Sequence, residues 1–121
     1  MTASFSSTAY TPDNLVAGEF DDLIAEKITV IAGQNLVRGS VIGKITASGK
    51  YNLSLSAAVD GSQVPDYILA ESIDATSADK VGLAYSRGDF TASALILGAS
   101  HTLASIKEGL RGKGIALINT I

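Results

Sequence analysis

The chain has 121 residues, no cysteine and a single histidine, which excludes a disulfide framework, a cysteine nucleophile and metal sites built from thiolates or several imidazoles. The formal net charge of −3 leaves no general basic field for nucleic acid, and 17% charged residues are too few for a long solvent-exposed helix. This length, with 46% apolar residues, predicts one domain around one hydrophobic core.

The first segment of the chain differs in composition from the rest. Residues Met1–Pro12 carry no charged side chain, Asp13–Glu26 carry only acidic ones, and Lys27 is the first basic residue. This shift predicts an N-terminal segment of residues 1–26 and a β-rich domain of residues 27–121. Two interpretations of the uncharged segment stay open: a frayed tail, or an arm that adds a strand to the sheet edge of a partner.

The domain is rich in β-branched residues and in glycine, which is typical of short strands separated by turns. The predicted strands are, in chain order, Lys27–Ile31, Leu36–Thr46, Lys50–Leu55, Tyr67–Ala70, Val81–Ser86, Phe90–Leu97 and Ile115–Ile121. Turn residues between them are Gly33–Asn35, Ser48–Gly49, Asp60–Gly61 and Arg87–Asp89, the last of which we interpret as a hairpin turn. Gly39 and Gly43 are expected to form bulges or bends within the second strand.

One short helix is predicted in the C-terminal half. Leu103, Ile106 and Leu110 lie at helical spacing on one face, and Thr102 or Ser100 can cap the N-terminus. Gly112 or Gly114 can provide the left-handed residue that ends the helix. The fold class is therefore mainly β with one short helix before the last strand.

The phosphate-binding and catalytic motifs that we tested fail. Gly43-Lys44 and Gly112-Lys113 are not followed by Ser or Thr as a phosphate loop requires. His101 could form a triad with Ser100 or Ser105, but no nucleophile elbow is present, and a place at the helix entry is the simpler interpretation. The residue chemistry therefore argues against an enzyme, and no cofactor or metal is expected.

Three charged motifs are interpreted as ordinary surface. Asp21-Asp22 lie in an acidic, polar stretch without the ligand spacing of a calcium loop. Arg87-Gly88-Asp89 matches a tripeptide that adhesion receptors bind, yet it is also suitable turn chemistry between two strands. The basic end of the helix, at Lys107, Arg111 and Lys113, is too small for a nucleic-acid site, although it could touch an acidic partner.

Membrane association is not expected either. The longest apolar runs, such as Ala94–Ala99, are far shorter than the roughly 18 residues of a spanning helix. The N-terminus has neither the basic start nor the apolar core of a signal peptide, so the expected default is an intracellular site of synthesis.

The order of several short motifs resembles the head decoration proteins of tailed phages, the family of the phage lambda decoration protein. The motifs are Arg38–Ile45, Gly49–Tyr51, Asp60–Pro65, Ile68–Glu71, Asp74–Thr76, Arg87–Phe90 and Leu97–Glu108. Each motif is short, and their common order and spacing carry the resemblance, which covers roughly residues 36–121. Residues 1–26 share only their character, an uncharged arm ahead of the domain.

The resemblance implies a homotrimer with a β-clip-like fold on the outer surface of the expanded capsid. Family members bind the major capsid protein at threefold and quasi-threefold sites, where they cement the head against the pressure of packaged DNA. They make no direct contact with nucleic acid, and they become part of the virion after synthesis in the host cytoplasm. The N-terminal arm faces the capsid, is loose in the free trimer and orders on the shell.

The candidate contact residues of the arm are Phe5, Thr8, Tyr10, Thr11, Pro12 and Leu15. Its aromatic and apolar side chains could fill shallow pockets, and Pro12 would limit the added strand because it lacks a backbone donor. An alternative function is a small β-barrel adaptor or carbohydrate-binding accessory module with an aromatic patch around Tyr51, Tyr67 and Tyr85. A hydrolase that uses His101 is the third hypothesis.

Overall fold

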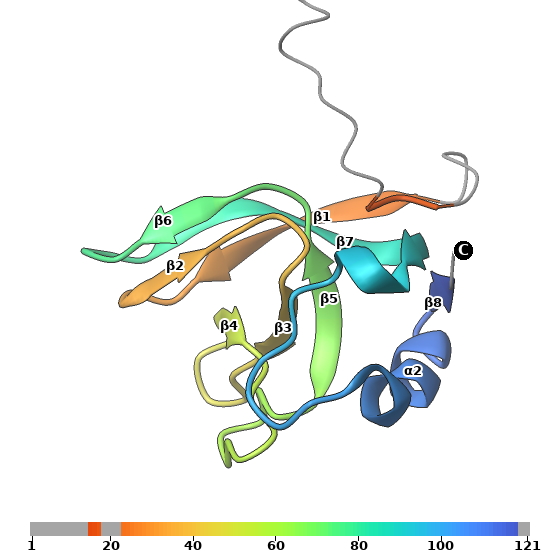
Figure 1. The fold of residues 1–121 in the computed structure, drawn as a ribbon. Coiled ribbons are helices and arrows are strands. Elements are labelled where there is room, and N and C mark those ends of the chain that lie inside the picture. Colours follow the sequence, from red (N-terminus) through yellow and green to blue (C-terminus); the bar gives the residue numbers. More distant parts are fainter. Residues whose placement is uncertain (1–14, 18–22, 119–121) are drawn as a thin grey trace, which may run out of the picture.

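The computed structural model of the chain describes residues 15–17 and 23–118. The strands are β1 (Ile24–Val30), β2 (Gln34–Leu36), β3 (Val41–Lys44), β4 (Tyr51–Leu53), β5 (Pro65–Leu69), β6 (Ile73–Ala75), β7 (Lys80–Thr91) and β8 (Ile115–Ile118). The helices are a 3-10 turn, η2 (Ala92–Ala94), and an α-helix, α2 (Leu103–Arg111) (Figure 1). The predicted class, mainly β with a short helix before the last strand, is confirmed.

Five strands close on themselves into a small barrel-like sheet. The order is β1-β4-β3-β5-β7, and β7 pairs again with β1, so both ends of the series meet. The strand pairs are antiparallel apart from β1–β4 and β7–β8, which are parallel. β8 extends the sheet from the far end of β7, and β2 and β6 form a separate two-stranded ribbon.

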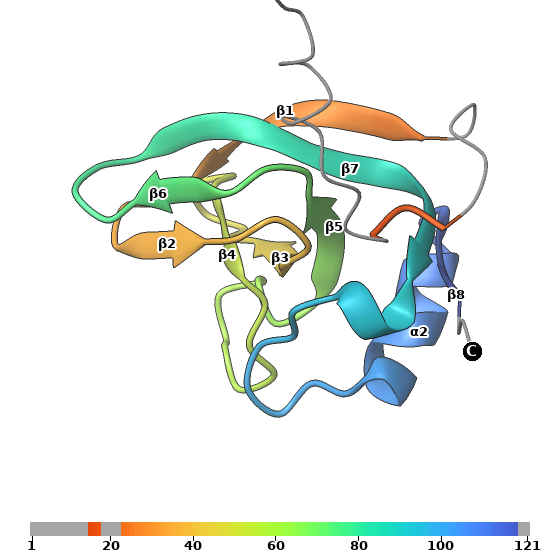
Figure 2. The ribbon, with the colours of Figure 1, turned by 45° about the horizontal axis from the view of Figure 1, so that its top comes forward.

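Two hydrophobic clusters lie on opposite sides of this sheet. One gathers Ile28, Val30, Ile42, Tyr51, Leu69 and Ala84 beneath Leu36, Ile73 and Ala75 of the β2–β6 ribbon. The ribbon comes so close that a Cβ on Gly82 would lie 2.1 Å from Cδ1 of Ile73. The ribbon and α2 lie on different sides of the barrel in both views (Figures 1 and 2).

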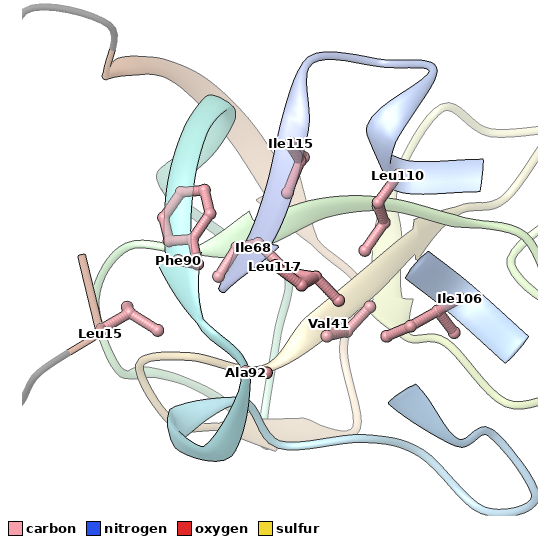
Figure 3. Packing of buried hydrophobic residues seen from close by; sticks show 9 residues of the cluster. All are labelled: Leu15, Val41, Ile68, Phe90, Ala92, Ile106, Leu110, Ile115 and Leu117. Atoms are coloured by element: carbon pink, nitrogen blue, oxygen red, sulfur yellow. The ribbon is translucent and has the colours of Figure 1, made fainter. Parts of the chain in front are cut away.

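The second cluster joins the sheet to α2, β8 and the first described segment of the chain. Its members are Leu15, Val41, Ile68, Phe90, Ala92, Ile106, Leu110, Ile115 and Leu117 (Figure 3). Ile106 and Leu110 come from the predicted apolar face of α2, and Thr102 caps that helix through a reciprocal bond pattern with Ser105. Gly114, at φ +95, is the left-handed residue after the helix.

The predicted hairpin turn at Arg87–Asp89 is wrong. These residues lie inside β7, which runs without interruption from Lys80 to Thr91. Gly88 adopts φ +145, and there the strand changes partners: residues up to Arg87 pair with β1, whereas Gly88–Thr91 pair with β8. Glycine is needed here because a Cβ would also meet Cδ1 of Leu23 at 2.7 Å.

Other strand boundaries differ from the predicted ones where pairing with a distant strand determines them. β1 begins at Ile24 rather than Lys27, because Ile24 and Ala25 pair with β7, so the expected division at residue 26 falls inside β1. The long second strand is divided into β2 and β3, with Gly39 at φ +94 between them and a register shift beside Gly43. The short strand β6, which no sequence pattern indicated, exists because it pairs with β2.

The described residues contain no helix with the length and apolar character that crossing a bilayer requires.

Two glycine substitutions should change stability in opposite directions. A Cβ at Gly43 would lie 2.1 Å from the backbone oxygen of Ser62, so we expect Gly43→Ala to lower the free energy of unfolding by about 1–3 kcal/mol. Gly109 lies on the exposed face of α2 with no atom within 4 Å of the added Cβ, so Gly109→Ala should raise it by about 0.5–1 kcal/mol. Urea unfolding at one protein concentration measures both, and equal effects would contradict the described packing.

Candidate functional site

The first described residues are bonded into the sheet of their own chain. The backbone oxygen of Leu15 accepts from the N–H of Thr91 at 2.8 Å, and the N–H of Ala17 donates to the oxygen of Asp89 at 2.9 Å. Between them, Val16 forms an antiparallel bridge with Phe90. We call Leu15–Ala17 the root of the N-terminal segment, because it holds that segment to β7.

The side chain of Leu15 completes this attachment. It is 1% exposed and lies in the cluster that includes Phe90, Ile68 and Leu117 (Figure 3). Burial of an isoleucine- or leucine-sized side chain stabilises a fold by about 1.5–3 kcal/mol. The root is therefore held by apolar packing as well as by two backbone hydrogen bonds.

The first and last described residues of the chain, Leu15 and Ile118, both lie beside Thr91 of β7. Thr91 bonds to Leu15 on one side and pairs with Ile118 of β8 on the other. The root is antiparallel to β7 and β8 is parallel to it, so Leu15 and Ile118 flank Thr91 on the two edges of β7. Figure 2 shows the root and β8 at the same end of β7.

The predicted contact residues divide into two groups. Leu15 lies in the core, where its side chain packs against its own chain. The other candidates, Phe5, Thr8, Tyr10, Thr11 and Pro12, lie outside the described residues, as do Asp21 and Asp22. Sequence reasoning missed Phe90 and Thr91 as the partners of the root, because no local pattern relates them to a segment so distant in the chain.

The three tyrosines do not form one aromatic patch. Tyr51 and Tyr67 stack with ring centroids 5.4 Å apart. Tyr85 shares the opposite sheet face with its strand partner Ile68, and it packs against Phe90 with Arg38 over its ring. The concave patch of Tyr51, Tyr67 and Tyr85 expected for a carbohydrate-binding module is therefore wrong as predicted.

The stacked pair lies beside a polar cleft of about 450 Å³. Its lining residues are Ile24, Glu26, Asp66, Tyr67, Ser86, Arg87 and Lys113. Two of these lining residues, Asp66 and Lys113, form an ion pair at 2.9 Å. Burial raises the pKa values of Tyr51 and Tyr67 above the ordinary value of a phenol, and the carboxylate of Asp66, with that of Glu26 for Tyr67, adds to this rise.

His101 contacts a different serine from those considered in the sequence. Its Nε2 lies 3.1 Å from Oγ of Ser54, which is buried, and this contact fastens the loop before α2 to the residue that follows β4. Ser105 is engaged in the helix cap. Within the described residues, no group of three His, Cys, Asp or Glu side chains could hold a metal ion.

Several motifs that carry the resemblance make hydrogen bonds inside the chain. The Asp60 carboxylate accepts from the N–H and hydroxyl of Ser62, and Asp74 does the same for Thr76. Arg38 donates from Nη1 to the backbone oxygen of Ala70 and to the hydroxyl of Tyr85. These residues shape turns and strand ends.

The fold and the root define a small barrel-like β domain whose N-terminal segment is fastened to the end of its longest strand. The model of one protein family, described as bacteriophage lambda head decoration protein D, matches residues 4–116. The chain belongs to this family of structural capsid proteins, and its role is decoration of a phage head. A comparison with curated proteins gives no match.

Removal of the Leu15 side chain should destabilise the domain. We expect Leu15→Ala to lower the free energy of unfolding by about 2–5 kcal/mol, because it leaves a cavity against Phe90. Val16→Ala, in the same segment but only half-buried, is the matched control and should cost about 1 kcal/mol. Denaturant unfolding compares the two, and equally small losses would show that the root does not pack on the core.

Proposed function

We propose that this protein is a cement: a homotrimer that binds the outer surface of the expanded head at threefold and quasi-threefold sites and holds neighbouring capsomers against internal DNA pressure. Its partners are the major capsid protein and two further copies of itself, and it acts without catalysis. The fold proposed for the trimer subunit is β-clip-like. Family membership supports decoration, and the fastened N-terminal segment is the observation that supports a mechanism through an arm.

Of the expected N-terminal segment of residues 1–26, the proposed arm is the part that precedes the root, residues 1–14, because residues 15–17 bond to β7 and residues 24–26 belong to β1. Its first twelve residues carry no charged side chain, so pairing with a capsid strand would desolvate no charge there. Backbone hydrogen bonds give affinity to such an added strand, and Phe5 and Tyr10 are the proposed anchors for pockets beside it. Thr8, Thr11 and Pro12 lie between and after these anchors, and Leu15 fixes the arm to the domain.

Because the root of each subunit is packed in its core, the three arms of a trimer can bind the capsid together. In a trimer, each bound arm raises the effective concentration of the next arm at its own site. That gain depends on a fixed spacing between the roots, which a bonded and buried Leu15 provides. A shell with different subunit spacing engages fewer arms, so binding favours the expanded lattice.

Deletion of residues 1–14 should separate capsid binding from folding. The truncated protein keeps Leu15 and its bonds to Thr91, so we expect an unchanged unfolding midpoint and loss of cosedimentation with expanded capsids. Full retention of capsid binding would remove the arm from the mechanism.

A proline in the middle of the arm should weaken binding more than a change of side chain does. Thr8→Pro removes a backbone donor from the added strand, whereas Thr8→Val keeps it. With three arms per trimer, we expect at least a tenfold loss of capsid affinity for Thr8→Pro and less than a threefold change for Thr8→Val. Equal affinities in a titration of expanded capsids would rule out strand addition at this position.

A further inference from the structure

The loop between β4 and β5 displays the most exposed large apolar side chain of the described residues. We call residues 55–64 the tip loop. Val59 is 95% exposed within it, and Val64, at 52%, is exposed on its later part. Single exposed apolar residues are normal on protein surfaces, so Val59 supports an interface only together with a surface that matches the loop.

The tip loop is held by hydrogen bonds within the loop and by one from Thr46, which follows β3. The N–H of Thr46 donates to the backbone oxygen of Asp60, whose carboxylate accepts from both the N–H and the hydroxyl of Ser62. The N–H of Gly61 donates to Oε1 of Gln63 at 2.8 Å. Bonds to Ser62 lower the pKa of Asp60, which keeps this exposed carboxylate charged. A loop ordered before association loses little conformational entropy on binding.

The same chain carries an apolar groove of about 260 Å³ on another part of its surface. The groove is lined by Ala92, Leu103, Ala104, Lys107 and Leu117, so four of its five lining side chains are apolar. Lys107 is exposed and forms no ion pair with the described residues, in contrast to Arg111, which pairs with Glu108, and Lys113, which pairs with Asp66. The groove thus combines apolar walls with one uncompensated cation.

We infer that the tip loop of one copy docks in this groove of the next copy, with Val59 against the apolar walls and Asp60 facing Lys107. The two surfaces match in character, since an apolar residue beside an anion on the loop meets apolar walls beside a cation in the groove. Loop and groove are different surfaces, so the contact is head-to-tail and can close into a ring. The inference rests on the trimer proposed above, for which it names the subunit interface.

Substitutions on both sides of the contact test it. Val59→Asp places a charge against the apolar walls, and Ala104→Glu, on an exposed helix position, places one inside the groove. Each should raise the dissociation constant for self-association at least tenfold, measured by sedimentation equilibrium. Val64→Asp introduces the same charge elsewhere on the tip loop and is the matched control, with less than a threefold effect expected.

A rescue experiment distinguishes direct contact from misfolding. Val59→Lys combined with Ala104→Glu would bring opposite charges together, so the double variant should associate at least fivefold more tightly than Ala104→Glu alone. Far-UV circular dichroism of each variant monitors the fold. A folded double variant that associates no more tightly than Ala104→Glu alone would overturn the proposed interface, and so would an Ala104→Glu variant that keeps the native mass.

Capsid binding is measured separately, so that the two proposals can fail independently. A trimer that Val59→Asp and Ala104→Glu leave intact, with normal cosedimentation, refutes the interface and leaves the decoration role standing. If Val59→Asp abolishes capsid binding but leaves the trimer intact, the tip loop contacts the capsid, and the proposed subunit interface is also refuted. If the unmodified protein is a monomer at every concentration, both the interface and the trimer are refuted. If Ala104→Glu lowers the melting temperature without changing the mass, the groove packs against the protein's own chain, and the interface is refuted.

Discussion

The change of partner within β7 is the constraint on which the rest of the structure depends. One half of this strand closes the barrel against β1, and the other half binds the root on one edge and β8 on the other. Gly88 permits the change because it adopts φ +145 where a side chain would collide with Leu23. A strand that turned back at this point would leave Leu15, β8 and α2 without the surface on which they pack.

The short motifs that carry the resemblance in the sequence lie apart from the residues proposed to bind the capsid. Asp60, Asp74 and Arg38 belong to the motifs that carry the resemblance, and each makes hydrogen bonds within its own chain. They preserve turns and strand ends, so they report the fold. Contact with the shell is assigned, in the proposal above, to residues 1–14, which the family model also matches from residue 4 onward.

Sequence reasoning succeeded where the determining contacts are local. The helix followed from the Thr102 cap and the spacing of Ile106 and Leu110, and the turn at Asp60–Gly61 followed from its residue types. It failed where distant pairing decides: an Arg-Gly-Asp segment with turn composition became part of a strand because β8 and the root pair with it. Leu15, a candidate contact residue of the arm, also lies in the core, and an isolated apolar side chain in a polar segment has no periodicity that reveals such a core partner.

The attachment of the root also determines how mechanical tension enters the domain. Leu15–Ala17 runs antiparallel to β7, and its two backbone hydrogen bonds lie across the direction of the strand. A pull along the root therefore shears both bonds at once and also draws Leu15 from the core, instead of opening the bonds in succession. If the arm binds the shell as proposed, swelling of the head would load this shear contact before it could peel the arm from β7.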